Sequence, residues 1–143
     1  MPTRSAKADW QGDFKRGGGT VSTETGVLDA PYNFSGRFES GTGTNPEELL
    51  GAAHAACFTM AFSFACDKAG FATAAVDTSA SVRLVKQGEG FAIDRIALTL
   101  QASVPGIAEE QFQQIAQRAK AECPLSKALA SVPEITLAAT LRA

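Results

Sequence analysis

Apolar and polar residues alternate in short runs along the first forty residues of the chain. Apolar side chains stand at every second position of residues 6–10, and glycines at 17–19 separate them from the apolar positions of residues 21–27. A third run, PYNFSGRFE, covers residues 31–39. A period of two between glycine-rich turns is typical of antiparallel strands. The pattern predicts a small antiparallel β-meander whose third segment carries Arg37.

A long apolar segment follows, in which the eighteen residues 49–66 carry no formal charge. Asn45 can cap a helix there, a proline follows it, and Glu48 stands three residues after the cap, as in a capping box. Gly70 suits the C-terminal stop. We predict one helix from residue 46 to about residue 68. Because it is apolar on all sides, it should lie buried between other protein layers.

Two strand-like stretches come next, at residues 79–86 and 90–104, and QGEG between them is typical of a hairpin turn. The inward face of the second stretch changes register near Asp94. Residues 108–122 have the spacing of a second helix, which Pro124 ends. Its buried stripe should hold Phe112, Ile115 and Ala119; residues 126–130 fit one more helical turn, and EITLAATL a last strand.

No repeat or linker separates these segments. We therefore predict one α+β domain over residues 1–143, with an N-terminal antiparallel meander, a long buried central helix, further antiparallel strands and a second helix.

The charges are few and evenly spread. The chain holds 13 Lys or Arg and 15 Asp or Glu, for a formal net charge of −2, and the basic residues form no cluster. Nucleic acid is therefore not an expected partner. The opening residues, MPTRSAKADW, lack the apolar core of a secretory signal, which predicts a cytoplasmic protein with reduced cysteines. Residues 49–66 are short for a membrane span and rich in Ala, so we expect no membrane partner.

Two of the three cysteines lie in the long predicted helix. Cys66 follows Cys57 by nine residues, which is about 180° around a helix axis, so the two thiols face opposite ways. Bridged cysteines need Cα atoms within about 7 Å and facing side chains, which excludes a disulfide between them. The remaining candidate partner is Cys123 in AECPLSKAL, where the second helix ends. It can meet Cys57 only through the fold.

Each of these residues taken alone also has a structural interpretation. A cysteine in an Ala-rich helix is most simply a small buried hydrophobic residue, which is how we interpret Cys66. Arg37 can be a solvated strand residue, and Glu47 a favourable charge in the first turn of a helix. His54 stands three residues before Cys57, within reach of a thiolate as a base or cation, and the sequence leaves its role open.

A zinc site built from His54 and the three cysteines is disfavoured. The helix directs Cys57 and Cys66 to opposite sides, and the chain contains no CxxC pair. We expect no metal.

The segments around the thiols carry a resemblance to a known family. TNPEELLGAAHAACFTMAF and AECPLSKAL resemble the OsmC subgroup of the OsmC/Ohr family of thiol-dependent hydroperoxide reductases. WQGDFKRGGGTVSTETGVL, GRFE, FAIDRIALTL, VPGI and EITLAATL follow the subgroup's order, so the resemblance covers nearly the whole chain. It implies an OsmC-like fold and an intertwined homodimer with two sites at the interface.

The resemblance also implies the roles of four residues. Cys57 is the peroxidatic cysteine, Cys123 the resolving cysteine before a proline, and Arg37 and Glu47 organise the site. The implied cycle reduces organic hydroperoxides, and hydrogen peroxide less efficiently, through a Cys57 sulfenic acid and a Cys57–Cys123 disulfide. An external dithiol of the lipoyl type restores the thiols, and no NAD, flavin or other cofactor is bound. The apolar side chains of Phe38, Phe58 and Phe62 are candidates for the substrate pocket.

Arg37 has a clear physical use in such a site, because a fixed cation favours the thiolate over the thiol. Glu47 would hold the guanidinium by charge-assisted hydrogen bonds. However, a straight helix separates Glu47 from Cys57 by about 15 Å along its axis. Either the helix breaks near Gly51, or Glu47 comes from a second, antiparallel copy. We favour the second copy, because the small residues before Cys57 permit close approach of two helices.

Two other functions remain open from the residues alone. One is a dithiol–disulfide oxidoreductase that acts on proteins, for which a CxxC pair would be expected. The other is a stress-related dimeric binding protein without enzymatic activity, whose thiols are incidental.

Overall fold

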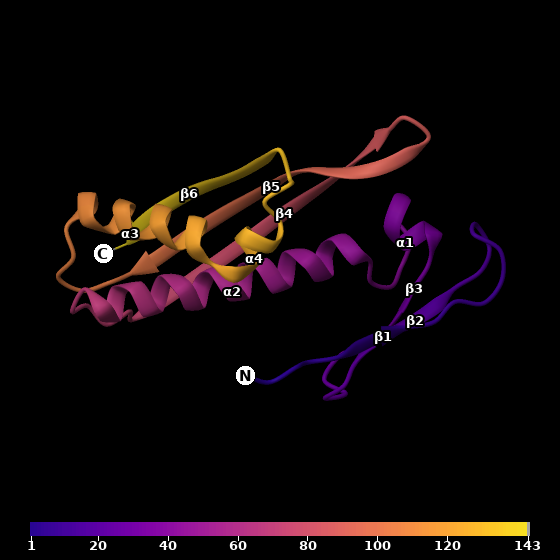
Figure 1. Ribbon diagram of the computed structural model, residues 1–143, viewed down its shortest axis with the longest axis horizontal. Helices are drawn as coiled ribbons and strands as arrows, with labels where there is room; N and C mark the ends of the chain where they lie inside the picture. Colours follow the sequence, from indigo (N-terminus) through magenta and orange to yellow (C-terminus); the bar gives the residue numbers. More distant parts are fainter. Residues whose placement is uncertain (143) are drawn as a thin grey trace. The chain divides into compact units, whose positions relative to one another are not determined.

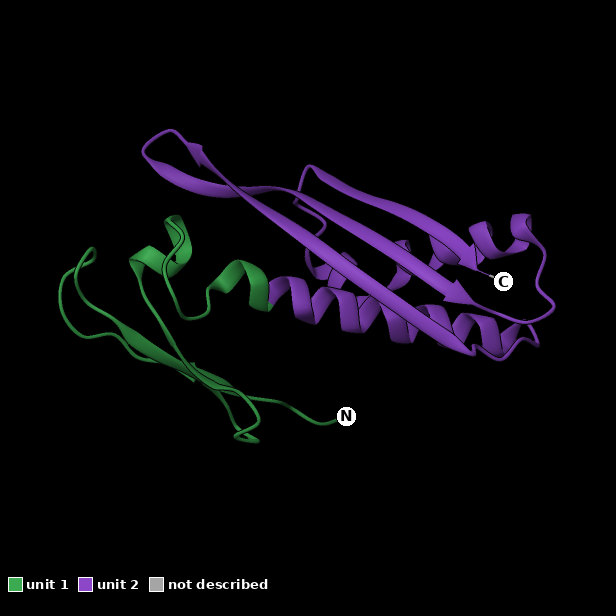
Figure 2. Cartoon of the chain, turned by 180° about the vertical axis from the view of Figure 1, so that it is seen from behind, with its two compact units in different colours: residues 1–49 green, residues 50–143 purple. Residues whose placement is uncertain are grey.

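The structure, a computed structural model, describes residues 1–142. The chain forms two compact units, Met1–Leu49 and Leu50–Ala143, shown in Figure 2 in green and purple. The boundary falls in the first turn of a long helix, α2, which spans Pro46–Lys68. The single domain expected from the sequence stays a prediction.

The first unit contains the predicted antiparallel meander. Its strands are β1 (Ala6–Ala8), β2 (Gly19–Thr23) and β3 (Asp29–Tyr32), which pair antiparallel in the order β1-β2-β3 (Figure 1). A Cβ atom at Gly19 would collide with the carbonyl oxygen of Asp9. Gly19 is the last of the three consecutive glycines and the first residue of β2. It must be a glycine because the backbone of Asp9 passes too close for a side chain.

The third predicted strand segment is wrong beyond Tyr32. The chain there turns into a short helix, α1 (Phe34–Phe38). Asn33 caps this helix, because its side-chain oxygen accepts the backbone N–H of Gly36 at 2.7 Å. An Asn side chain offers the backbone a local hydrogen bond that competes with a strand ladder. Arg37 therefore lies on a helix and not on a strand.

Helix α2 begins and ends where the sequence predicts. The Asn45 side chain accepts the backbone N–H of Glu48 at 2.8 Å, which confirms the cap. The Glu48 carboxylate in turn accepts the hydroxyl of Thr44 at 2.7 Å. Beyond the helix, Gly70 adopts a φ of 91°, which confirms the glycine stop.

Only one face of α2 is buried in the chain. Phe58, Phe62 and Cys66 are fully buried in the core, whereas Met60 and Phe64 are 74% and 65% exposed. The prediction that α2 is buried on all sides therefore holds for one face and is wrong for the face that carries Met60 and Phe64. By length and composition α2 would suffice to cross a membrane, a property that it shares with core helices of soluble proteins.

The second unit is built on the sheet β4-β5-β6, and α2 and α3 cover one face of it in Figure 1 and Figure 2. The predicted hairpin turn is confirmed between its first two strands. Arg83 pairs with Arg95 and the next residue, Leu84, with Ile93, so Asp94 is the extra residue of a bulge. The predicted register change is thus confirmed. The bounds are β4 (Ala75–Gln87), β5 (Gly90–Ser103) and β6 (Glu134–Arg142).

The last strand corrects the expectation of antiparallel strands throughout, because β6 pairs parallel with β5. The chain between them passes through two helices, α3 (Glu109–Glu122) and α4 (Pro124–Ala128). Such a helical crossover returns the chain to the end where it started, which a tight hairpin cannot do. The predicted stripe of α3 is confirmed, since Phe112, Ile115 and Ala119 are all buried.

We expect Phe62→Ala to lower the free energy of unfolding by about 3–5 kcal/mol, because it leaves a cavity in the core. The Phe62 ring is fully buried and meets the Phe112 ring edge-on at 5.6 Å between centroids. The matched control is Phe91→Ala at a ring that is 53% exposed, which should cost less than about 1 kcal/mol. Urea denaturation measures both, and equal losses would contradict the assigned core.

Candidate active site

Cys123 stands where one helix ends and the next begins. Its backbone N–H donates to the Ala119 carbonyl at 3.0 Å, which closes α3. Its sulfur accepts the backbone N–H of Ser126 at 3.4 Å, which caps α4. The residue before a proline is disfavoured in the helical region, so Pro124 sets this break. The thiol is therefore placed by backbone geometry at a helix junction.

The fold brings the Cys123 thiol beside Cys57, in the middle of α2. Both cysteines are free. Burial raises the pKa of the Cys57 thiol, the backbone N–H of Leu125 lowers it, and the adjacent Cys123 thiol raises it again. Two thiols that lie 66 positions apart in the chain thus meet within the second unit.

The third thiol lies in the core, as its position on the helix predicts. Cys66 is fully buried, and burial, followed by the charge of Asp67, raises the pKa of its thiol. It takes no part in the pair formed by Cys57 and Cys123.

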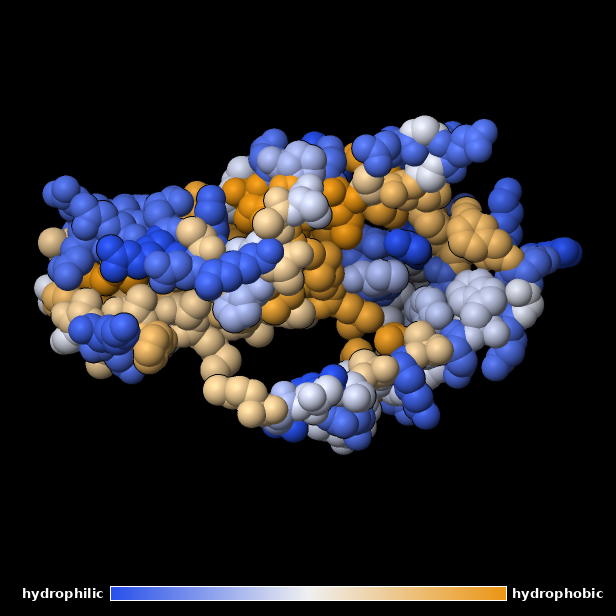
Figure 3. All heavy atoms as spheres, in the orientation of Figure 1, coloured by the Kyte–Doolittle hydropathy of each residue, from blue (hydrophilic) through white to orange (hydrophobic). Residues whose placement is uncertain are grey.

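Solvent reaches the two paired sulfurs unequally. Cys57 is partly exposed and lines a groove of about 1190 Å³ between α2 and α3, whereas Cys123 is fully buried. Met60, Phe64 and Ile115 provide apolar walls. In Figure 3 polar side chains of α3 lie over a paler, more hydrophobic surface of α2. A small molecule from water therefore meets Cys57 first.

The aromatic residues that the sequence suggested for a pocket are placed differently. Phe58 and Phe62 are fully buried in the core and do not line the groove. Phe38 belongs to the first unit, where its ring packs against Phe34 at 4.9 Å between centroids. The exposed positions of α2, Met60 and Phe64, take the place of Phe58 and Phe62 because the helix turns the latter pair into the core.

Arg37 and Glu47 form an ion pair in the first unit. The Arg37 Nε and one terminal nitrogen donate to the two oxygens of Glu47, each at 3.1 Å. Helix α1 carries Arg37, the first turn of α2 carries Glu47, and Asn45 ties the two by donating to the Gly36 carbonyl at 3.2 Å. Such a bidentate pair fixes the plane of the guanidinium and leaves its other N–H donors for a ligand.

His54 is directed away from the role that the sequence suggested for it. Its ring is fully buried, and its Nε2 lies 2.8 Å from the hydroxyl oxygen of Ser126, not against the sulfur of Cys57. That hydroxyl oxygen accepts the Cys123 thiol at 3.4 Å. Burial lowers the pKa of His54. Sequence reasoning missed Ser126 as a site residue; its one signal is its place three residues after Cys123, in the first turn of α4.

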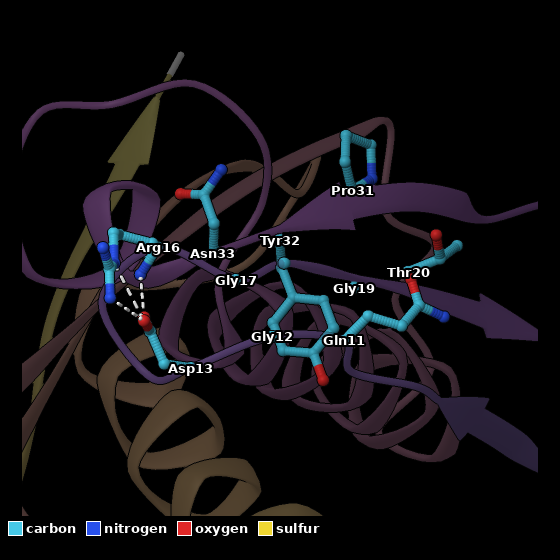
Figure 4. A pocket seen from close by; sticks show the side chains of 11 residues that line it. Gln11, Gly12, Asp13, Arg16, Gly17, Gly19, Thr20, Pro31, Tyr32 and Asn33 are labelled. Carbon is cyan, nitrogen blue, oxygen red and sulfur yellow. Dashed lines mark hydrogen bonds and ion pairs between the residues drawn. The ribbon is translucent and has the colours of Figure 1, made fainter.

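A second hollow, of about 710 Å³, lies against the glycine-rich loop of the first unit (Figure 4). The close-up shows the Asp13 and Arg16 side chains next to each other at one side of it, and their ion pair measures 2.7 Å. The one basic side chain of its lining is thus already neutralised. Within residues 1–142, no three His, Cys, Asp or Glu side chains gather in a way that would hold a metal ion.

Comparison with known proteins shows the family of the chain. The family model described as OsmC-like protein matches residues 39–138. The chain is 55% identical over 135 residues to peroxiredoxin OsmC of Escherichia coli strain K12, which covers 94% of this chain and 93% of that protein. It is 30% identical to an organic hydroperoxide resistance protein of Xanthomonas axonopodis pv. citri, over 85% of each chain.

Solved structures show the same fold. An organic hydroperoxide resistance protein OsmC from Legionella pneumophila superposes with a TM-score of 0.76 at 26% identity, over 98% of both chains. An OsmC like protein from Mycoplasma pneumoniae gives a TM-score of 0.78 at 14% identity, over 99% of both chains, which is a likeness of fold alone. The resemblance inferred from the cysteine motifs is confirmed: this chain belongs to the OsmC family and has its α+β fold.

Proposed function

We propose that this protein is a thiol-dependent peroxidase that reduces organic hydroperoxides, with Cys57 as the attacking sulfur. The observation that carries the proposal is the Cys57 thiol, which lines an open groove and touches a second, fully buried thiol. The relatives are named a peroxiredoxin and organic hydroperoxide resistance proteins, which supports the same chemistry. The apolar walls of the groove suit an organic hydroperoxide better than hydrogen peroxide.

The first step is attack of the Cys57 thiolate on the terminal oxygen of the hydroperoxide. The sulfur–oxygen bond forms as the oxygen–oxygen bond breaks, so Cys57 becomes a sulfenic acid and the alkoxide leaves as an alcohol after it takes a proton. The sulfur is oxidised and the peroxide is reduced. Cys57 suits this role because it is the reachable thiol of the pair.

The second step joins the two sulfurs. Cys123 attacks the Cys57 sulfur, the sulfur–oxygen bond breaks, and water leaves as the disulfide forms. Cys123 already touches Cys57 in the reduced protein, so this step needs only a local adjustment at the start of α4. The buried position of Cys123 keeps it from reacting with peroxide in place of Cys57.

Burial works against the first step, because it raises the pKa of the Cys57 thiol. A nearby cation is needed to favour the thiolate at neutral pH. We assign this role to the Arg37 guanidinium, whose plane Glu47 holds through two hydrogen bonds. The oriented fork can contact the sulfur and a peroxide oxygen together.

The proposed assembly is a homodimer in which a second copy supplies the Arg37–Glu47 pair to each Cys57. Helix α2 continues without a break through Gly51, which supports the second copy over a helix break. Its exposed stripe, Ala53, Ala56, Met60 and Phe64, is apolar and narrow enough for another helix to pack closely. Gly51 itself serves its own chain, since a Cβ atom there would stand 3.3 Å from the Ala80 carbonyl oxygen.

A dithiol of the lipoyl type is the proposed reductant, in the cytoplasm and without a bound NAD or flavin. Its thiolate attacks the exposed Cys57 sulfur of the disulfide and releases Cys123, and its second thiol then frees Cys57. Protein disulfides are less suitable substrates, because a folded partner would have to reach a sulfur at the bottom of a groove.

Replacing Cys57 by Ser should lower the consumption of tert-butyl hydroperoxide with dihydrolipoamide by at least about 10²-fold, because the nucleophile is lost. Cys66→Ala is the matched control, since Cys66 lies on the same helix but is fully buried. Cys123→Ser should form the sulfenic acid and then overoxidise under excess peroxide. If Cys57→Ser consumes the hydroperoxide as fast as the unmodified protein, the proposed function is wrong.

Arg37→Met should move the pH at which half of Cys57 is alkylated upward by about 1 unit or more, because it removes a cation and leaves burial, which raises the pKa. Peroxidase activity at neutral pH should fall with it and recover partly as the pH is raised. The control is Arg83→Met, another arginine bound bidentately by a carboxylate, that of Asp94, at 2.8 and 2.9 Å. An unchanged midpoint in Arg37→Met would reject the role of the cation.

Phe64→Glu should convert a dimer into a monomer of 14.9 kDa with reduced activity, because it places a charge in the apolar stripe of α2. Sedimentation equilibrium measures the mass. The control, Val27→Glu, alters a side chain that is 89% exposed in the first unit and should leave the dimer intact. An unmodified protein that is monomeric and fully active would rule out a site shared between copies.

A further inference from the structure

A chain of three side chains runs from the resolving position into the interior of the second unit. The Cys123 thiol donates to the Ser126 hydroxyl oxygen at 3.4 Å, and that oxygen lies 2.8 Å from His54 Nε2. Because the thiol occupies Ser126 as an acceptor, the hydroxyl hydrogen is free to point at Nε2. In the tautomer of His54 that leaves Nε2 without a hydrogen, every hydrogen in this chain is directed from Cys123 toward the imidazole.

The three groups are sealed from water. Cys123 and His54 are fully buried, and Ser126 is 9% exposed. A thiol that must lose its proton in such a place cannot pass it to solvent directly. Among residues 1–142, the basic group that it reaches through hydrogen bonds is the imidazole of His54.

The imidazole is held in a state that can accept a proton. Burial lowers the pKa of the His54 imidazole and so favours its neutral form. Its second nitrogen, Nδ1, is buried without a hydrogen-bond partner. A buried polar group without a partner lowers the stability of the fold by about 1–3 kcal/mol. A histidine whose sole role was to connect α2 to α4 would therefore destabilise the protein.

We propose that His54, acting through Ser126, accepts the proton of the Cys123 thiol as Cys123 condenses with the Cys57 sulfenic acid. The inference rests on the proposed peroxidase function and assigns the residues that drive its second step. Ser126 touches the reacting thiol. His54 positions the Ser126 hydroxyl through a hydrogen bond and accepts its proton.

The proton and electron balance needs no further reactant. The Cys123 proton passes to the Ser126 oxygen as the Ser126 proton passes to His54 Nε2, which makes an imidazolium. The Cys123 sulfur is oxidised as it forms the sulfur–sulfur bond, and the Cys57 sulfur is reduced as its bond to oxygen breaks. The departing hydroxide takes a proton from solvent in the groove that Cys57 lines and leaves as water, and the imidazolium keeps the Cys123 proton until the disulfide is reduced.

The backbone supports this transfer at the sulfur. The N–H of Ser126 donates to the Cys123 sulfur at 3.4 Å and can stabilise the negative charge that develops there. One residue therefore presents a donor and an acceptor to the same thiol. When a dithiol later releases Cys123 from the disulfide, the relay returns the proton by the reverse path.

The test separates the two steps in a single turnover. Reduced protein is mixed with one equivalent of tert-butyl hydroperoxide and quenched, and mass spectrometry counts dimedone-trapped Cys57 sulfenic acid and the Cys57–Cys123 disulfide. In His54→Gln and Ser126→Ala, disulfide formation should slow on the order of 10²-fold while the loss of reduced Cys57 stays within about threefold. Sulfenic acid should accumulate and, with excess peroxide, proceed to sulfinic acid.

The choice of variants distinguishes a relay from a structural tie. Gln at position 54 keeps a hydrogen-bonding group near Ser126 but cannot take a proton, and Ser126→Thr keeps the hydroxyl and should retain most of the rate. The double variant His54→Gln with Ser126→Ala should be no slower than Ser126→Ala alone, because both remove one path. The matched control is Ser63→Ala. Ser63 lies on the same helix as His54, and the variant loses a side-chain hydrogen bond of 3.3 Å to Thr73.

Each outcome has one meaning. If folded His54→Gln forms the disulfide at the rate of the unmodified protein, the relay is wrong and the peroxidase function stands. If the unmodified protein forms no Cys57 sulfenic acid, the proposed function fails before the relay is reached. Slower disulfide formation in Ser63→Ala to the same extent would reassign the effect to helix packing and overturn the proposal.

Discussion

The contact between the thiols of Cys57 and Cys123 is the interaction on which the rest of the site depends. It exists because α3 ends at Pro124 and places the second sulfur against the middle of α2. A thiol in a packed helical stripe would be fixed by its neighbours. At a helix junction it is fixed by backbone hydrogen bonds.

This placement gives the Cys57 and Cys123 thiols different access to solvent. Cys57 opens onto an apolar groove from which a substrate can reach it, whereas Cys123 is fully buried and contacts Cys57 and Ser126. Covering a thiol removes water as its proton acceptor, and the buried pair of Ser126 and His54 supplies a replacement on the proposal made above. Burial also raises the pKa of the Cys57 thiol, and for this reason the mechanism that we propose takes a cation from the ion pair of Arg37 with Glu47.

Local rules recovered most of the secondary structure. The Asn45 cap, the Gly70 stop and the extra residue at Asp94 follow from short-range hydrogen bonding and side-chain alternation, and the structure confirms all three. The prediction failed at residues 33–38, where one Asn side chain replaced a strand ladder by a capped turn. It also failed for β6, because pairing direction depends on how the crossover returns and not on the strand's own residues.

The sequence by itself determined the boundaries of α2 and α3, the opposite facing of Cys57 and Cys66, and the family, through motifs that cover nearly the whole chain. Tertiary structure alone decided that Cys57 meets Cys123, that α2 buries one face, and that His54 is directed to Ser126 and not to Cys57. Helical periodicity fixes angles within one element. Which face meets which neighbour depends on contacts between residues far apart in the chain, and periodicity carries no information about those.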